Sequence, residues 1–123
     1  DFGALSQGQR QIVILARCIV QDSPVMLMDE PDSALDFLNR HMVLSKIREL
    51  IKEENKAGLI TLHDPNFAMA YCDRLLLLKE GRLVGELDMR RAKADEVKKK
   101  LSLIYGDIEL LQSGDSFLMG KAL

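Results

Sequence analysis

The chain has 123 residues, 47% of them hydrophobic and 29% charged, which is typical of one globular domain and excludes disordered and collagen-like chains. Its net charge of -2, from 17 basic and 19 acidic residues, provides no basic surface for nucleic acid or anionic lipid. Without an apolar run of roughly 20 residues, direct insertion into a membrane is not expected.

A helix is predicted from the N-cap candidate Ser6 to about Gln21, because apolar residues recur at i, i+3, i+4 and i+7. After Ser23-Pro24, the continuous apolar run 25–28 predicts a strand buried on both faces of a parallel sheet. Helical spacing over 35–54, closed by 55–58, is followed by a short apolar strand over 59–62. These segments predict a β-α-β unit.

The second half begins with a short helix, for which Asp64 is the predicted N-cap and Pro65 the first residue, ending near residue 72. Strands over 75–78 and 82–87 flank a Gly-containing connection and predict an antiparallel hairpin. An amphipathic helix over 91–105 stops at Gly106, and two further strands are expected over 108–111 and 117–119. Parallel pairing therefore gives way to antiparallel pairing.

The cysteines Cys18 and Cys72 lie in apolar helical contexts without a C-x-x-C spacing, which favours free thiols in a reducing compartment. The chain also begins at Asp1 without an initiator methionine, directly before a motif, as a piece of a longer protein would.

Two consecutive carboxylates, Asp29 and Glu30, follow the first apolar strand. Open α/β sheets bind ligands at the carboxyl ends of their strands. Asp29 is the candidate for Mg²⁺, which takes oxygen ligands and keeps much of its water, and Glu30 is a candidate to polarise a water attacking a γ-phosphate. The alternative is a strand that simply meets a polar turn.

Ser6 and Gly8 place a hydroxyl and exposed backbone N–H groups at a helix N-terminus, an arrangement that binds anions. An ordinary N-cap explains the same pattern. His63 ends the second strand at the same sheet edge, although a lone histidine there is more often structural. His41, on the long helix, is interpreted as a residue without a functional role.

Taken together, these motifs are stronger evidence for a function than any one of them is alone. Leu5-Ser6-Gln7-Gly8-Gln9, Val25 to Pro31, Ser33-Ala34-Leu35-Asp36 and His63 resemble, in this order and spacing, the signature motif, Walker B motif, D-loop and switch histidine of ABC ATPases. The hairpin over 75–87 is also similar to the family. The resemblance implies an α/β chain with a partial P-loop NTPase fold: a mainly parallel sheet with flanking helices and a C-terminal antiparallel hairpin. It divides into a signature helix (1–22), a core with hairpin (24–90) and a C-terminal helix and tail (91–123).

The resemblance implies ATP and Mg²⁺ as cofactors and a role for each matching residue. Asp29 would support Mg²⁺, Glu30 would be the catalytic base, and His63 would sense and stabilise the γ-phosphate. The signature residues would contact ATP held by the opposite subunit of a head-to-tail dimer, and Asp36 would bridge the dimer interface. The implied ATP-contacting residues are Ser6, Gln7, Gly8 and Gln9 in the signature and Asp36 in the D-loop.

Two departures from the family pattern stand out. Asp32 occupies a position where the family usually has threonine, which adds a negative charge near the phosphates. In addition, the chain contains no G-x-x-x-x-G-K-[ST] loop and no glutamine loop following it, so nothing in it cradles the β- and γ-phosphates. The chain alone is therefore expected to be inactive, with part of its core exposed.

Residues 63–74 and 103–106 are similar to ATP-binding subunits of iron-siderophore, haem and cobalamin importers. This resemblance implies an ATP-hydrolysing subunit that pairs with a second ATPase subunit and with transmembrane permease subunits, on the cytoplasmic face of the cell membrane. The alternatives are a non-transport ABC ATPase and an inactive interaction module that pairs with an intact ATPase subunit. The basic clusters at 90–91 and 98–100 fit a membrane or permease contact or, more simply, a solvated helix face.

Overall fold

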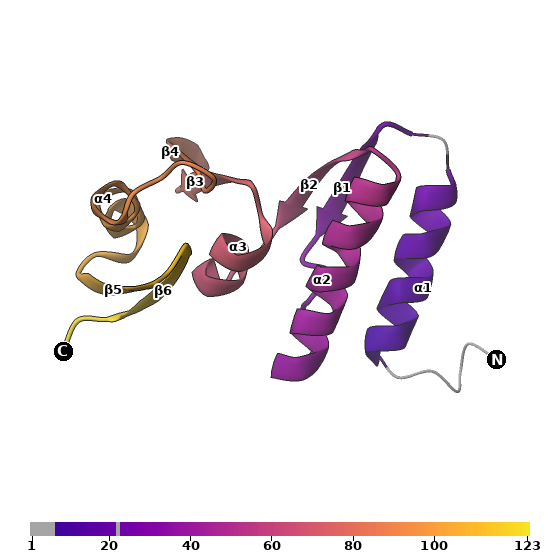
Figure 1. Cartoon of the computed structure of the whole chain (residues 1–123), viewed down its shortest axis with the longest axis horizontal. Coiled ribbons are helices and arrows are strands. Elements are labelled where there is room, and N and C mark those ends of the chain that lie inside the picture. The colour runs from indigo at the N-terminus through magenta and orange to yellow at the C-terminus, as the bar shows by residue number, and fades with distance from the viewer. Residues whose placement is uncertain (1–6, 22) are drawn as a thin grey trace. The chain divides into compact units, whose positions relative to one another are not determined.

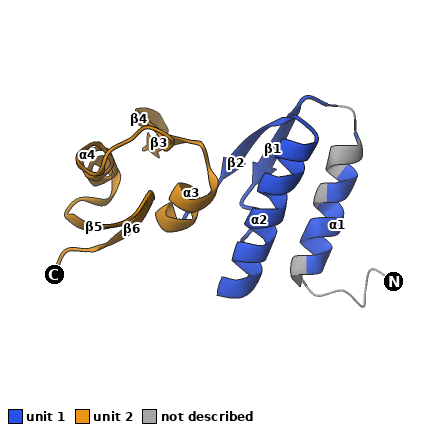
Figure 2. Ribbon diagram, in the orientation of Figure 1, with its two compact units in different colours: residues 1–63 blue, residues 64–123 orange. Residues whose placement is uncertain are grey.

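A computed structural model describes residues 7–21 and 23–123 (Figure 1). The chain forms two compact units, Asp1–His63 and Asp64–Leu123 (Figure 2). None of the helices in residues 7–21 and 23–123 combines the length and the apolar composition of a membrane-spanning segment.

The first unit contains a parallel β-α-β arrangement preceded by a helix. Its elements in chain order are α1 (Gln7–Val20), β1 (Val25–Asp29), α2 (Phe37–Glu53) and β2 (Ala57–Thr61). Strands β1 and β2 pair in parallel, and their last residues, Asp29 and Thr61, are partners in the register. The predicted β-α-β unit is therefore confirmed, and the chemistry-bearing end of β1 lies beside the end of β2.

The two faces of this sheet differ in burial. Met26 of β1 is buried, as are Val43, Leu44 and Ile47 of α2. On the other face Val25 is 50%, Leu27 76% and Leu59 54% exposed. The prediction that this strand is buried on both faces is therefore wrong for the chain as described, because its two-stranded sheet has α2 on one side and no described element covering these residues. The expected exposure of part of the core is confirmed.

Strand β2 begins at Ala57, two residues before the predicted start, so Gly58 belongs to the strand rather than to the helix end. A Cβ added at Gly58 would lie 2.5 Å from Cδ1 of Ile51 on α2 and 3.3 Å from Cε of Met28. Glycine therefore permits close approach of helix and strand. The helix itself ends with Glu54 as C-cap, followed by Asn55 at a φ of 51°.

The second unit consists of short helices and antiparallel hairpins. Its elements are α3 (Pro65–Tyr71), β3 (Arg74–Lys79), β4 (Arg82–Asp88), α4 (Ala94–Tyr105), β5 (Ile108–Ser113) and β6 (Ser116–Lys121). Asp64 caps α3 as predicted, its carboxylate accepting hydrogen bonds from the backbone N–H groups of Asn66 at 2.8 Å and Phe67 at 3.4 Å. Helix α4 begins three residues later than predicted and ends at Gly106, as predicted.

The β3–β4 hairpin turns through two residues, the second of which is the glycine of the predicted connection. Glu80 and Gly81 have φ values of 50° and 75°. Two consecutive positive φ values in a two-residue connection are the geometry that matches the right-handed twist of paired strands. The antiparallel pairing is as predicted, with an irregularity between Leu77 and Leu78.

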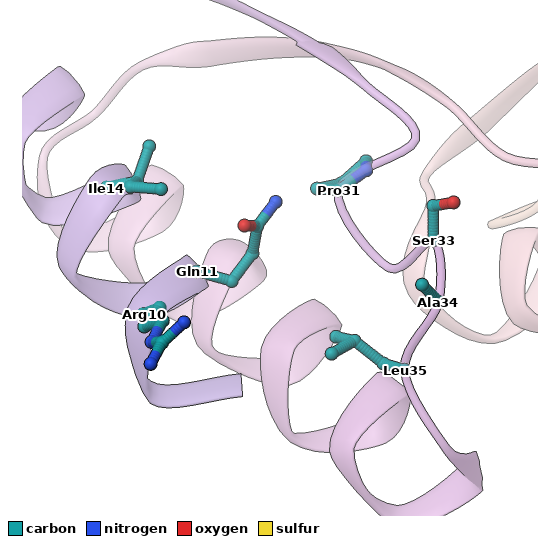
Figure 3. Close-up of a pocket in the computed structure, with 7 residues that line it drawn as sticks. All are labelled: Arg10, Gln11, Ile14, Pro31, Ser33, Ala34 and Leu35. Carbon is teal, nitrogen blue, oxygen red and sulfur yellow. The ribbon is translucent and has the colours of Figure 1, made fainter. Parts of the chain in front are cut away.

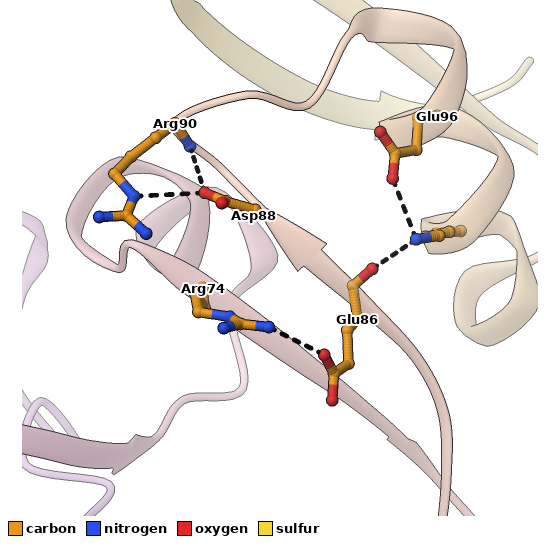
Figure 4. A network of polar contacts seen from close by, with 6 residues as sticks. Arg74, Glu86, Asp88, Arg90 and Glu96 are labelled. Atoms are coloured by element: carbon orange, nitrogen blue, oxygen red, sulfur yellow. Dashed lines mark hydrogen bonds and ion pairs between the residues drawn. The ribbon is translucent and has the colours of Figure 1, made fainter.

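The hairpins of the second unit pack on its two helices, the β3–β4 hairpin on α4 and the β5–β6 hairpin on α3 and α4. One core cluster joins α3, β3, β4, α4 and β5, with these buried members: Met69, Leu75, Leu77, Leu87, Val97, Leu101 and Ile108. Asn66 fastens β6 to α3, donating to the carbonyl of Met119 at 3.1 Å and accepting from its N–H at 2.6 Å. Figure 4 shows the exposed polar contacts along β3 and β4, including Arg74 with Glu86 at 3.1 Å. This unit thus closes its own core from local elements.

Candidate functional site

The carboxyl ends of β1 and β2 are joined by the hydroxyl of Thr61. It donates a hydrogen bond to Oδ1 of Asp29 at 2.6 Å and accepts one from the backbone N–H of Glu30 at 2.9 Å. The same N–H also lies 3.2 Å from the carbonyl oxygen of Thr61. The neighbouring strand therefore fixes both the carboxylate of Asp29 and the backbone that carries Glu30.

Glu30 contacts His63, with Oε1 of the carboxylate against Nε2 of the imidazole. The imidazole is largely exposed, whereas the carboxylate is about one third exposed. Both residues line a pocket of about 200 Å³ that also includes Asp32 and Arg40. The structure thus brings together the two residues predicted to be catalytic, on the same unit and beside Asp29.

Asp32 is buried, with 4% of its surface exposed. Its Oδ2 accepts a hydrogen bond from Nε of Arg40 at 3.0 Å and forms an ion pair with Nη2 of the same guanidinium at 2.9 Å. A buried carboxylate requires such a partner, because an unpaired charge away from water is strongly unfavourable. The extra negative charge noted in the sequence is therefore balanced by a guanidinium of α2.

The loop between β1 and α2 is held in an unusual backbone conformation. Glu30 and Ala34 have φ values of 46° and 63°, in the left-handed region that residues with a Cβ seldom adopt. The N–H of Ser33 bonds to the carbonyl of Glu30 at 3.0 Å. The loop ends at Asp36, whose Oδ1 accepts from the N–H of Asn39 at 2.8 Å and so caps α2. Asp36 thus has a structural role in this chain that the sequence analysis did not identify.

Helix α1 lies beside the same loop. A pocket of about 260 Å³ is lined from α1 by Arg10, Gln11 and Ile14 and from the loop by Pro31, Ser33, Ala34 and Leu35. Figure 3 shows Gln11 projecting from α1 toward the loop. The predicted phosphate-binding residue Gln9 is exposed on α1. Ser6 lies outside the described residues, and the surroundings of Gln7 and Gly8 at the start of α1 are not described either, so the predicted phosphate contacts of these three residues are not tested.

The donor groups fit a hydrated magnesium ion better than a metal held by protein alone. Among the described residues, no three His, Cys, Asp or Glu side chains are grouped as metal ligands. Asp29 offers a hard carboxylate, and Mg²⁺ is commonly bound through one or two carboxylates while water and substrate phosphates complete its shell. Asp29 therefore remains a chemically suitable candidate ligand.

Three groups at this site were not identified from the sequence: the hydroxyl of Thr61, the guanidinium of Arg40 and the carboxylate of Asp32 as its buried partner. Aligning the two predicted strands in parallel would have placed Thr61 opposite Asp29. The partnership of Arg40 with Asp32 had no such signal, because an arginine in the first turns of a helix is ordinarily interpreted as a solvated residue.

Known proteins are similar to this chain over most of its length. Residues 1–33 match the family model described as "ABC transporter". The haemin import ATP-binding protein of Vibrio parahaemolyticus is 38% identical over 110 residues, which are 85% of this chain and 41% of that protein. The cobalamin import ATP-binding protein of Halobacterium salinarum is 40% identical over 83 residues, which are 68% of this chain and 21% of that protein.

A solved structure is also similar. It is described as an inward-facing conformation of a metal-chelate type ABC transporter, and it superposes with a TM-score of 0.74 at 30% sequence identity over 97% of this chain and 48% of that chain. This similarity confirms the predicted α/β fold class. The chain spans less than half the length of the relatives that it matches.

Proposed function

This chain belongs to the ABC transporter ATPase family, and we propose that it forms part of the ATP-binding and ATP-hydrolysing subunit of an importer. Similar proteins from two organisms are named for haemin import and for cobalamin import. The proposed cargo class is accordingly a metal chelate: an iron-siderophore complex, haem or cobalamin. Within this proposal, residues 1–22 form the signature helix, 24–90 the core with its hairpin, and 91–123 the C-terminal helix and tail.

The observation that carries the proposal is the contact between Glu30 and His63 beside Asp29. Phosphoryl transfer depends on positioned groups that orient the attacking water and stabilise charge on the transferred phosphoryl group. Glu30 is the general base: its carboxylate accepts a proton from the attacking water at Oε. His63, which stands against the same carboxylate, presents its imidazole to the γ-phosphate and stabilises negative charge there.

Asp29 is the proposed magnesium-supporting residue, and Thr61 holds its Oδ1 in place. When it is bound beside ATP, Mg²⁺ neutralises negative charge on the phosphates. The carboxylate is exposed at the end of β1, where water and phosphate oxygens can complete an octahedral shell. Asp29 is the last residue of β1 and Glu30 the first residue of the loop that follows, and in this proposal one carboxylate serves the metal and the other the water.

The remaining assignments concern the assembled transporter. Ser6, Gln7, Gly8 and Gln9 contact ATP bound by a second ATPase subunit in a head-to-tail dimer, and Asp36 lies at that interface. The helix N-terminus that carries the signature favours negatively charged phosphate. Permease subunits in the membrane are the further partners, which places the protein on the cytoplasmic face of the cell membrane.

The test is ATP turnover and Mg-ATP binding by this chain, with and without a segment that carries a phosphate-binding loop. Turnover is expected only in the combined sample. Glu30→Gln should lower kcat at least about 100-fold, because it removes a general base without altering shape. Mg-ATP binding should persist in that variant.

Glu53→Gln, which alters an exposed carboxylate on α2, is the matched control and should retain turnover. A folded, combined sample that binds Mg-ATP but never hydrolyses it would overturn the assignments of Glu30 and His63. That result would favour an interaction module that pairs with an intact ATPase subunit.

A further inference from the structure

We propose that Asp32 and Arg40 are a positioning pair for the loop that carries Glu30 and Asp36. The inference rests on the proposed function, since its consequence is measured as ATP turnover. It concerns a residue at which this chain departs from the threonine usual in the family. Neither Asp32 nor Arg40 is proposed to touch ATP.

The pair lies at the middle of the loop. Asp32 is two residues beyond Glu30 and four before Asp36, so its side chain anchors the segment between the proposed base and the proposed dimer contact. Among the described residues, Asp32 is the charged side chain recorded as buried. Its partner Arg40 is the fourth residue of α2, and the backbone N–H of Arg40 bonds to the carbonyl of Asp36 at 2.8 Å, which closes the first turn of the helix. The ion pair therefore ties the loop to the helix that the same loop begins.

The loop needs such an anchor because its backbone is strained. Glu30 and Ala34 both have left-handed φ values without being glycine, and these conformations persist only where surrounding contacts hold them. The ends are held by Thr61, which accepts from the N–H of Glu30, and by Asp36, which caps α2. Between those ends, the carbonyl of Asp32 accepts from the N–H of Leu35 at 3.3 Å, while its carboxylate is held by Arg40.

The pair also borders the reacting groups. Asp32 and Arg40 line the same pocket of about 200 Å³ as Glu30 and His63. A shift of this loop would therefore move the carboxylate of Glu30 relative to the imidazole of His63. Misplacement of a reacting group by about 1 Å can cost roughly 100-fold in rate. Positioning by the ion pair should accordingly affect kcat more than the apparent affinity for ATP.

The test uses this chain combined with the phosphate-binding segment. Asp32→Asn keeps the shape of the side chain and removes its charge, and it should lower kcat about 10- to 100-fold while KM for ATP changes less than about 3-fold. Amide hydrogen exchange at Ser33 and Leu35 should become faster. The double variant Asp32→Asn with Arg40→Gln, which removes both charges and keeps two groups able to hydrogen bond, should recover part of the lost kcat.

Glu49→Gln is the matched control, because it breaks the exposed pair of Lys46 and Glu49 on the same helix. It should leave kcat and exchange unchanged. If the unmodified sample hydrolyses ATP and Asp32→Asn does so equally well, the positioning role is wrong and the proposed function stands. If Asp32→Asn does not fold, the double variant tests the positioning role instead. A folded double variant with unimpaired kcat would overturn the inference. An unmodified sample without turnover overturns the proposed function, and this inference with it.

Discussion

The two units differ in which residues adopt left-handed backbone. In residues 64–123, positive φ values occur at Gly81, Gly106 and Gly114, with Glu80 beside one of them. In the described part of residues 1–63, they occur at Glu30, Ala34 and Asn55. Glycine adopts this conformation at little steric cost, whereas other residues store of order 1–3 kcal/mol of strain. The second unit therefore places glycine at most of its left-handed positions. The first unit has other residues there, and most of the resulting backbone strain lies in the loop of the candidate site.

The units also differ in how completely they bury their apolar residues. Antiparallel hairpins and α4 enclose the core of the second unit, where Val97 and Leu101 are almost fully buried. The parallel pair in the first unit leaves Leu27 largely exposed. Parallel sheets are normally covered on both faces. The comparison indicates that the second unit derives its stability from its own contacts to a greater extent than the first.

The largest effect is expected from Leu101→Ala in the second unit. Leu101 is 1% exposed within the core cluster, and deleting a fully buried leucine side chain typically costs about 2–5 kcal/mol. Urea unfolding followed by circular dichroism measures the change. Leu27→Ala, at a position 76% exposed, is the control and should change stability by less than about 0.5 kcal/mol. Equal losses in the two variants would contradict the difference in burial.

A smaller effect should distinguish the strained loop from the glycine turns. Ala34→Gly should stabilise the first unit by up to about 1 kcal/mol, because it relieves a left-handed residue. Gly114→Ala, at a φ of 60° with no atom within 4 Å of the added Cβ, should destabilise the second unit by about 1 kcal/mol through backbone strain alone. Denaturant midpoints of the two variants provide the measurement. Destabilisation by Ala34→Gly would show that no strain is stored there.

The smallest effect concerns Asp88 at the end of β4. A hydrogen bond from the backbone N–H of Arg90, reinforced by its guanidinium, lowers the pKa of the Asp88 carboxyl, against a smaller opposing effect of burial (Figure 4). Because the folded-state pKa is below the unfolded value, this carboxylate stabilises the fold above the unfolded pKa. That contribution is lost as the pH falls through the folded pKa.

NMR titration of the Asp88 carboxyl measures this shift directly. Arg90→Ala should preserve most of it, because the backbone N–H is the largest cause and survives the substitution. A return of the Asp88 pKa to its ordinary value in Arg90→Ala would instead assign the shift to the guanidinium.

Local patterns in the sequence predicted the order and type of the elements and the candidate residues at the end of β1. Apolar periodicity, the capping residue Asp64 and the stop at Gly106 are local signals, and local backbone preferences sufficed to interpret them. The placement of Asp29 and Glu30 at a strand end followed from the apolar run before them. The family resemblance added the roles of individual residues, and all of these roles stay predictions.

Which side chains contact one another depends instead on how the chain folds. Thr61 reaches Asp29 across 32 positions of sequence, and Arg40 reaches Asp32 across 8. Gly58 leaves room for the side chain of Ile51 on the preceding helix, and the exposure of Leu27 depends on what covers the sheet rather than on its own segment. Periodicity reports the face on which a residue lies, whereas burial and ion pairing depend on partners brought close by folding. The candidate residues of the site could therefore be predicted from the sequence, but the contacts that position their side chains could not.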